Sequence, residues 1–420
     1  MSGQDIDSFD TFPNGVSSPN LCNGSQTPSN VSNLLIPNDT ASLPESVSPN
    51  PDMSENVLNT VDSVGEELMS EEVYTSANLV LGRVVYSLQA LALVSNVINV
   101  LVMTRRSMRS SASRYLVSMS VVQLIYIVLL LVPTVHGLLT PRVMTDVFYL
   151  AYTIYVKNYV MSCLRRVLYV LHCLVSVERL LAVLLPLKAK NYVIVMKPVI
   201  FIVVTPIVIF IAHIHVALKL EVEEVVGEDN STFHSYRYTD LYLRHPHLFS
   251  TLNVASKVIF VYGTLLFLVV ANVVLIVALR IHAAKRRQMD TNINVSAARR
   301  RERQMTVTIL VSTLIFTVLC LPTVSNSVVY NLVPESYGPF TTHRYLFQFV
   351  QSLGGACYVL AFSSDFFTYV SLSSAYRNTL LRMVKRMTRR GAEDVTKTSV
   401  SGMSVTQVTS APRGGDDEKY

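Results

Sequence analysis

Seven long apolar segments constrain the fold of this chain more than any other feature of its sequence. They comprise residues 77–103, 114–138, 147–179, 193–218, 249–282, 304–332 and 345–371. Each is near or above the ~20 residues that a helix needs to cross a bilayer. Because backbone groups inside lipid find no water to bond, each segment is predicted to be a helix. The expected fold class is an all-α membrane protein, a seven-transmembrane helix bundle.

The composition argues against an ordinary soluble enzyme. Hydrophobic residues make up 50% of the chain and charged residues only 15%, compared with about 25% charged residues in soluble domains. No hydrolytic or phosphate-binding motif occurs, so we expect neither an enzyme nor a bound cofactor. The five cysteines include no Cys-x-x-Cys pair, which argues against a metal or redox centre.

Basic residues mark the loops that come after the first, third, fifth and seventh segments. The loop after the fifth segment is the richest, with eight Lys or Arg from Arg280 to Arg303. The positive-inside rule places these loops in the cytoplasm and explains them better than nucleic-acid binding does. We therefore expect a multi-pass protein of the plasma membrane, with its N-terminus outside and its C-terminus in the cytoplasm.

Composition divides the chain into four parts. Residues 1–76 are polar and acidic and are predicted to be a disordered extracellular segment, whereas residues 77–372 form the membrane domain. Residues 373–390 are basic and amphipathic, as expected for a helix on the membrane surface. Residues 391–420 are predicted to be a disordered cytoplasmic tail. Glycosylation sequons on the expected outer side begin at Asn23, Asn30, Asn38 and Asn230.

Four short motifs lie within or beside the apolar segments. They are TRRSMRSSASRYL after the first, VSVERLLAVLLPLKA at the end of the third, LCLP in the sixth and DFFTY in the seventh. With these motifs the chain resembles the rhodopsin-like G-protein-coupled receptors, in particular invertebrate neuropeptide receptors of the FMRFamide-receptor type. The resemblance covers about residues 78–390. It implies a receptor that senses an extracellular ligand, expected to be a neuropeptide, and activates a heterotrimeric G protein.

The resemblance also implies roles for individual residues. Glu178 and Arg179 stand for the charged pair at the cytoplasmic end of helix three, and Glu302 stands for the resting partner of that Arg on helix six. Asp365 and Tyr369 occupy the helix-seven motif. The switch region of helix six comprises Phe316, Cys320 and Pro322. Phosphorylation of the Ser and Thr residues in the tail would recruit arrestin in such a receptor.

Departures from the family pattern leave alternatives open. Cys320 replaces the helix-six Trp, Gln123 replaces the helix-two Asp, and Ile154 stands where the family has a disulfide-forming Cys. The loop 219–248 also lacks Cys, so it must be held by other contacts or move. A constitutively active or decoy seven-helix protein is therefore one alternative. A transporter or channel is less favoured, because neither repeated spans nor rings of like charge occur.

Ionisable residues inside apolar segments are costly and therefore indicate function. Lys157, Arg165 and Lys257 are predicted to form a positive pocket that suits a ligand carboxylate. Alternatively these cations pair internally, Arg165 or Arg166 with Asp365 and Lys157 with an acid of the loop Glu221–Asp229. Adjacent residues on a helix diverge by ~100°, so Arg165 and Arg166 are not expected to share one role.

The residues at two further candidate pocket positions argue against an amine ligand and against retinal. Met161 stands where amine receptors carry an Asp, and Val359 stands where opsins carry the retinal-binding Lys. Residues 1–78 contain twelve acids and no Lys or Arg. This acidic segment either attracts a basic peptide or is a solvated, glycosylated stalk, and only the first possibility conflicts with a positive pocket.

Overall fold

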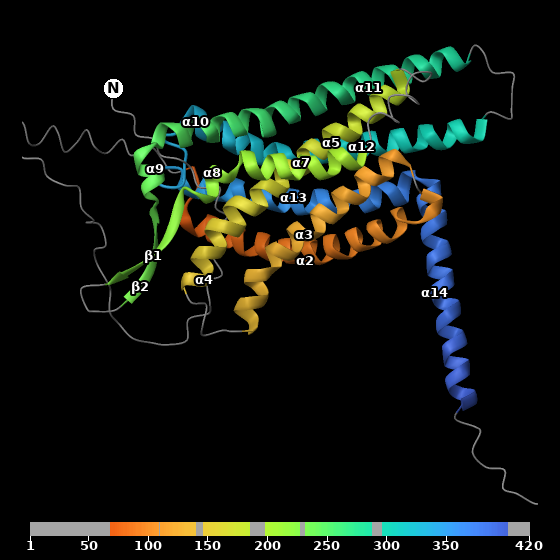
Figure 1. The fold of residues 1–420 in the computed structure, drawn as a ribbon, viewed down its shortest axis with the longest axis horizontal. Coiled ribbons are helices and arrows are strands. Elements are labelled where there is room, and N and C mark those ends of the chain that lie inside the picture. Colours follow the sequence, from red (N-terminus) through yellow and green to blue (C-terminus); the bar gives the residue numbers. More distant parts are fainter. Residues whose placement is uncertain are drawn as a thin grey trace, which may run out of the picture.

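The computed structural model describes residues 68–108, 110–139, 146–184, 198–226, 232–287 and 296–401. The predicted sequons Asn23, Asn30, Asn38 and Asn230 lie outside these residues. The described chain is a bundle of long helices with a β-hairpin at one end, and a helix projects crosswise from the other end (Figure 1).

Six helical stretches of the described chain are long and apolar enough to cross a bilayer. The first, second, sixth and seventh predicted segments correspond to α2 (Glu71–Met103), α3 (Ser111–Leu139), α12 (Ser296–Leu332) and α13 (Arg344–Leu372). The third consists of α4 (Asp146–Ala151), a π-helical segment at Tyr152–Val160 and α5 (Met161–Leu184). The fifth consists of α10 (Pro246–Lys257), a π-helical segment at Val258–Gly263 and α11 (Thr264–Arg287).

The fourth predicted segment has a shorter helix. Here α7 (Pro198–Ala212) contains 15 residues, and α8 (Ile214–Ala217) begins after a break at His213. At 1.5 Å per residue, α7 alone spans roughly 22 Å, less than the ~30 Å hydrocarbon layer. Val203, Ile207 and Ile211 of α7 are exposed, as expected of a helix whose outer face is covered by lipid.

The first helix starts earlier than the sequence analysis predicted. Ser70 caps α2, its hydroxyl accepting a hydrogen bond from the Val73 amide at 3.5 Å, and Glu71 and Glu72 occupy the first turn. A Ser cap followed by acids stabilises a helix N-terminus. The predicted boundary at residue 77 is therefore wrong by six residues, because apolar character alone marked it.

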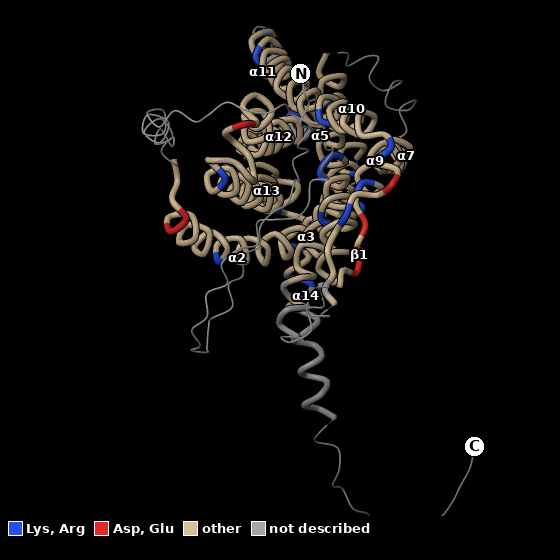
Figure 2. Tube along the Cα trace, turned by 90° about the vertical axis from the view of Figure 1, so that its left-hand side faces the viewer, with Lys and Arg blue, Asp and Glu red and all other residues tan. Residues whose placement is uncertain are grey.

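Helix α5 lies at the centre of the bundle and contacts α3, α7, α11 and α12. Leu164, Leu168 and Leu171 of α5 are buried in the main hydrophobic cluster. Seen from the hairpin end, the visible Asp and Glu lie at the rim of the ring of helices (Figure 2), whereas Asp365 is buried inside the bundle. Arg166 and Arg179 of α5 are buried, so this central helix brings positive charge into the bundle.

A β-hairpin that the sequence analysis did not predict comes after α8. Strands β1 (Leu220–Val226) and β2 (Thr232–Tyr238) pair antiparallel, with Leu220 opposite Tyr238. Arg237 donates from Nε to Glu221 at 2.8 Å and from Nη1 to Glu223 at 3.0 Å. These carboxylates raise the pKa of Arg237, the hydrogen bond to Glu221 having the largest effect.

The hairpin is held without the disulfide that the resembled family uses. Helix α4, at the hairpin end of the third span, packs against both strands. Tyr242 of α9 (Asp240–Arg244) stacks on Tyr238, with ring centroids 4.7 Å apart, and meets Phe249 edge-on at 5.4 Å. The Lys219 ammonium lies 4.9 Å from the centre of the Tyr242 ring. Packing and cation–π contacts therefore supply the attachment.

We expect Tyr242→Ala to loosen the hairpin strongly, because the substitution removes the centre of this aromatic cluster. Arg237→Ala is the matched control and should change little, because the ion pairs of Arg237 are exposed and solvent screens them. Hydrogen–deuterium exchange of β1 and β2 measures the difference. Equal exchange in both variants would show that the aromatic cluster does not hold the loop.

Helix α14 (Ser374–Ser401) leaves the bundle crosswise to the spans (Figure 1). The Tyr376 hydroxyl donates to the Asn99 side-chain oxygen at 2.7 Å, and Ser107 and Thr379 share a hydrogen bond at 3.2 Å. These bonds tie the start of α14 to the end of α2 and to the short 3-10 turn Arg106–Met108 that follows it. The helix runs past the predicted end at residue 390 into the predicted disordered tail, because residues 391–401 contain no Pro to stop it.

Candidate ligand cavity and switch region

A cavity of about 70 Å³ opens between the third, fifth, sixth and seventh spans, in the half of the bundle nearest the hairpin. Its wall combines cationic, aromatic and small polar side chains from α5, α12, α13 and the residues around the second π-helical segment. The residues that line it are Arg165, Arg166, Tyr169, Lys257, Val261, Tyr262, Thr323, Val324, Asn326, Ser327, Tyr330, Phe347, Gln351 and Tyr358.

Two of the five predicted pocket residues, Arg165 and Lys257, line this cavity. The other three are not among its described lining residues. Met161 and Val359 are buried in the hydrophobic core, and Lys157 belongs to the first π-helical segment, two turns before Arg165. The positive pocket therefore forms from a different set of cations than the sequence indicated.

Arg166 also lines the cavity. The expectation that it has a different role from Arg165 stays a prediction, and the two side chains make different contacts. Arg166 Nη1 donates to the carbonyl oxygen and hydroxyl of Ser162, at 3.1 and 2.5 Å. The Arg165 guanidinium carbon lies 5.9 Å from the centre of the Tyr358 ring. The two backbone positions diverge, but Arg side chains are long enough to turn back to one cavity.

The internal pairing of an Arg with Asp365 is also not found. Asp365 accepts hydrogen bonds from Gln123 Nε2 at 3.1 Å and from the Ser312 hydroxyl at 2.5 Å. These residues belong to α13, α3 and α12, so one buried carboxylate connects three spans. Gln123, in the place of the resembled family's Asp, thus becomes a donor to the acid that helix seven supplies.

One of the two π-helical segments contributes to the cavity wall, whereas no residue of Tyr152–Val160 is among the described lining residues. Val258–Gly263 begins directly after Lys257 and contributes Val261 and Tyr262 to the wall. A π-helical turn holds an extra residue and rotates the part of the helix beyond it, and such turns are frequent at functional sites. Sequence periodicity assumes regular α-helix, and therefore misplaces side chains beyond these segments.

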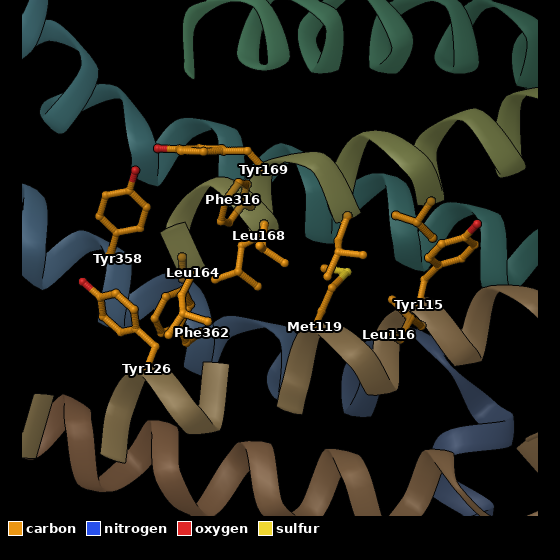
Figure 3. Packing of buried hydrophobic residues seen from close by; sticks show 14 of the residues in the cluster. Tyr115, Leu116, Met119, Tyr126, Leu164, Leu168, Tyr169, Phe316, Tyr358 and Phe362 are labelled. Atoms are coloured by element: carbon orange, nitrogen blue, oxygen red, sulfur yellow. The ribbon is translucent and has the colours of Figure 1, made fainter. Parts of the chain in front are cut away.

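The predicted switch residue Phe316 packs against a residue of the cavity wall. Tyr169, which lines the cavity, meets Phe316 of α12 edge-on with ring centroids 5.5 Å apart (Figure 3). On its other side Phe316 stacks on His172, at 3.8 Å and nearly parallel. Tyr358 of α13 also meets Tyr169, at 6.2 Å. Aromatic contacts thus connect the cavity to the middle of α12.

The other two switch residues lie further along α12. Cys320 is fully buried one turn after Phe316. Pro322 lies inside the helix, where its missing N–H weakens one turn. The next residue, Thr323, lines the cavity, so the weakened turn and the ligand space adjoin.

The charged pair lies at the opposite end of α5. Arg179 Nη2 donates to Glu178 Oε1 at 2.9 Å, and both side chains are about nine-tenths buried. Helix α12 is described at Glu302, but its side chain lies outside the described part, so the Arg179–Glu302 contact stays a prediction. Tyr369 is buried one turn after Asp365, near the C-terminal end of α13.

Sequence reasoning missed the aromatic wall of the cavity. Tyr169, Tyr330, Phe347 and Tyr358 are ordinary members of apolar segments, where large aromatic residues usually fill the core. One signal was present, because Tyr169 comes four residues after Arg165 and therefore lies on the same helix face. For the wall residues of α12 and α13 the sequence carried no comparable signal.

A helical membrane bundle with a cavity at one end and a buried charged pair at the other is the architecture of a seven-helix receptor. The chain belongs to the family of serpentine type 7TM GPCR chemoreceptors, Srw, whose model matches residues 83–387. No curated protein matches the chain.

The family match confirms the predicted seven-transmembrane fold. The protein is a multi-pass membrane receptor of the G-protein-coupled class that senses an extracellular ligand. The narrower resemblance to rhodopsin-like receptors of the FMRFamide type stays a prediction.

Proposed function

We propose that this receptor senses a neuropeptide at the plasma membrane and activates a heterotrimeric G protein. The observation that carries the proposal is the position of Tyr169, which lines the cavity and packs against Phe316 of α12. A ligand that displaces Tyr169 must change the packing of α12. The ligand shifts the equilibrium only by its difference in affinity for the two arrangements.

In the proposed resting state, polar contacts hold the inner half of α12. Ser312 donates to Asp365, and the Thr313 hydroxyl donates to the Asn272 side-chain oxygen of α11 at 2.9 Å. On activation this half of α12 swings outward at the turn weakened by Pro322. Arg179 then leaves Glu302 and meets the G protein.

The proposed orientation has the hairpin outside and α14 in the cytoplasm. Exposed basic side chains of α14, among them Arg382, Lys385 and Arg386, suit the anionic inner leaflet. Glycans on Asn23, Asn30, Asn38 and Asn230 would then be extracellular. Phosphorylated Ser and Thr residues beyond α14 would bind arrestin.

The buried ties of α12 favour a receptor that is quiet without ligand over the alternative of a constitutively active protein. Two hydrogen bonds and the His172–Phe316–Tyr169 stack must all be broken or rearranged before α12 moves. A decoy differs from both in failing to couple at all.

Arg179→Ala tests coupling. We expect G-protein activation in transfected cells to fall at least about tenfold, since a charged hydrogen bond contributes roughly 1.5–3 kcal/mol. The substitution is best made in a Ser312→Ala background as well, which should supply a basal signal when no ligand is known. The matched control is Arg83→Ala, because Arg83 is an exposed Arg of α2. Unchanged signalling in Arg179→Ala, at equal surface expression, would refute the proposed coupling role.

A further inference from the structure

A further cavity lies at the end of the bundle from which α14 leaves (Figure 1). The start of α14 packs there against α2 and the 3-10 turn at Arg106–Met108. The volume of this cavity is about 660 Å³, within the range of about 300–1,000 Å³ typical of ligand pockets. Its described lining residues come from the end of α2, the turn into α3, the start of α3 and the start of α7; they are Met103, Thr104, Ser110, Ser111, Ser113, Arg114, Val117, Val199 and Ile202. The site is therefore separate from the cavity near the hairpin.

One side of this cavity is apolar and meets the lipid-facing surface of the bundle. Val199 of α7, which lines the cavity, is 51% exposed. On α3, Val121 and Ile125 are exposed and come seven and eleven residues after Arg114, a spacing that places them on the same helix face. At 1.5 Å per residue, Ile125 lies roughly 16 Å from Arg114 along the helix, about half of the ~30 Å hydrocarbon layer. This exposed face of α3 matches the depth of one leaflet, so the group available to it is an acyl chain.

The other side of the cavity is a rim of hydrogen-bonding groups at the start of α3. The Ser113 hydroxyl donates to the Met108 carbonyl oxygen at 2.5 Å, and the Ser110 hydroxyl accepts from the Ser113 amide at 3.1 Å. These bonds fix the turn into α3 and thereby the position of Arg114 in the first turn of the helix. A guanidinium matches the oxygens of a phosphate group. Because it has five N–H donors, Arg114 can bind a phosphate while it keeps other contacts.

From this juxtaposition of an apolar, lipid-facing side and a donor-bearing rim we infer that the cavity binds a glycerophospholipid. Arg114 and the Ser111 hydroxyl bind the phosphate, and one acyl chain lies along the exposed face of α3. A sterol fills the apolar side but offers no phosphate to the guanidinium, whereas a soluble phosphate leaves the apolar side without a partner. The inference goes beyond the proposed function, because it concerns a second site and does not depend on G-protein coupling.

The phospholipid site adjoins the packing of three spans. Met103 lines both this cavity and a neighbouring one of about 20 Å³, whose wall also includes Ile309 of α12 and Tyr369 of α13. A lipid held against Met103 therefore supports the contacts among α2, α12 and α13 at this end of the bundle. Because it binds the folded receptor and not the unfolded chain, it raises the thermal unfolding temperature.

The test titrates the purified full-length receptor in detergent micelles and follows its thermal unfolding temperature. Three probes separate the parts of the lipid: dioleoyl phosphatidate has the phosphate and the chains, dioleoylglycerol has the chains alone, and glycerol 3-phosphate has the phosphate alone. We expect saturable stabilisation by the phosphatidate and at least about tenfold weaker binding of each of the other two, which lose either the charged hydrogen bonds or the apolar contact. Equal binding of dioleoylglycerol, equal binding of glycerol 3-phosphate, or no saturable stabilisation by the phosphatidate would overturn the inference.

Variants place the lipid at this cavity. Arg114→Gln should weaken binding of the phosphatidate by at least about tenfold, whereas the charge-matched control Arg105→Gln should change it little, because Arg105 is exposed nearby but is not among the described lining residues. Val199→Trp should also weaken binding by filling the apolar side, and its control is Ile211→Trp, an exposed position further along α7. Arg114 and Val199 are both exposed, so these variants should fold. Equal losses in Arg114→Gln and Arg105→Gln, or unchanged binding in Arg114→Gln and Val199→Trp, would overturn the inference.

Discussion

Gly354→Val is expected to abolish most surface expression of the receptor. Among the described elements, helices α12 and α13 share the most extensive contact, and Gly354 of α13 faces Thr323 of α12. A Cβ atom at this position would lie 2.3 Å from Thr323 Oγ1 and 3.3 Å from Thr323 Cα. Rotation of the Thr323 side chain relieves the first contact, but the second involves backbone and requires the helices to separate.

The expected effects are graded. Overpacking a well-packed interior costs typically about 1–3 kcal/mol, so Gly354→Ala should lower the thermal unfolding temperature and Gly354→Val should lower it further. Thr323→Ala should partly rescue Gly354→Ala, because it removes the nearest atom. Gly82→Ala is the matched control: no atom lies within 4 Å of its Cβ position. Native stability of Gly354→Val would show that α12 and α13 are not packed as described.

Ser312→Ala is expected to raise basal G-protein activation by about tenfold or more. The substitution removes the hydrogen bond by which α12 is tied to Asp365, while the bond from Gln123 to Asp365 remains. Loss of a bond to a charged group shifts the balance between arrangements by roughly 1.5–3 kcal/mol, which favours the state in which α12 has moved outward. Basal signalling normalised to surface receptor measures this shift.

Gln123→Ala separates this effect from a general loss of stability. It also removes one bond to Asp365, but from α3 and not from the helix proposed to move. We expect it to destabilise the receptor about as much as Ser312→Ala without raising basal activity to the same extent. Equal basal signals in the two variants would contradict a specific tie between α13 and α12.

The general architecture was predictable from the sequence because the bilayer acts on each segment separately. A run of apolar residues must become a helix in lipid whatever its neighbours do. The spans, the crosswise helix at residue 374 and the buried Glu178–Arg179 pair all arise from such local patterns. The exceptions are also local: Ser70 extends α2, and alternating residues in the loop after α8 form a hairpin.

The candidate site was only partly predictable, because its residues come from different helices. Arg165 and Lys257 were found as charges in apolar segments. Arg166 was left out of the predicted pocket, because only the angle between neighbouring residues on a helix was considered. The π-helical segments rotate the third and fifth spans, and no periodicity in the sequence reveals that rotation. The contact between Tyr169 of α5 and Phe316 of α12 likewise joins two different helices.

The sequence by itself determined the number and positions of the apolar spans and the places where charge enters them, since hydrophobic transfer depends mainly on local composition. The tertiary structure alone decided that three cations meet at one cavity, that Asp365 bonds with Gln123 and Ser312, and that Phe316 packs between Tyr169 and His172. The physical reason is that these contacts depend on how the helices rotate and approach one another, which packing of the whole bundle sets.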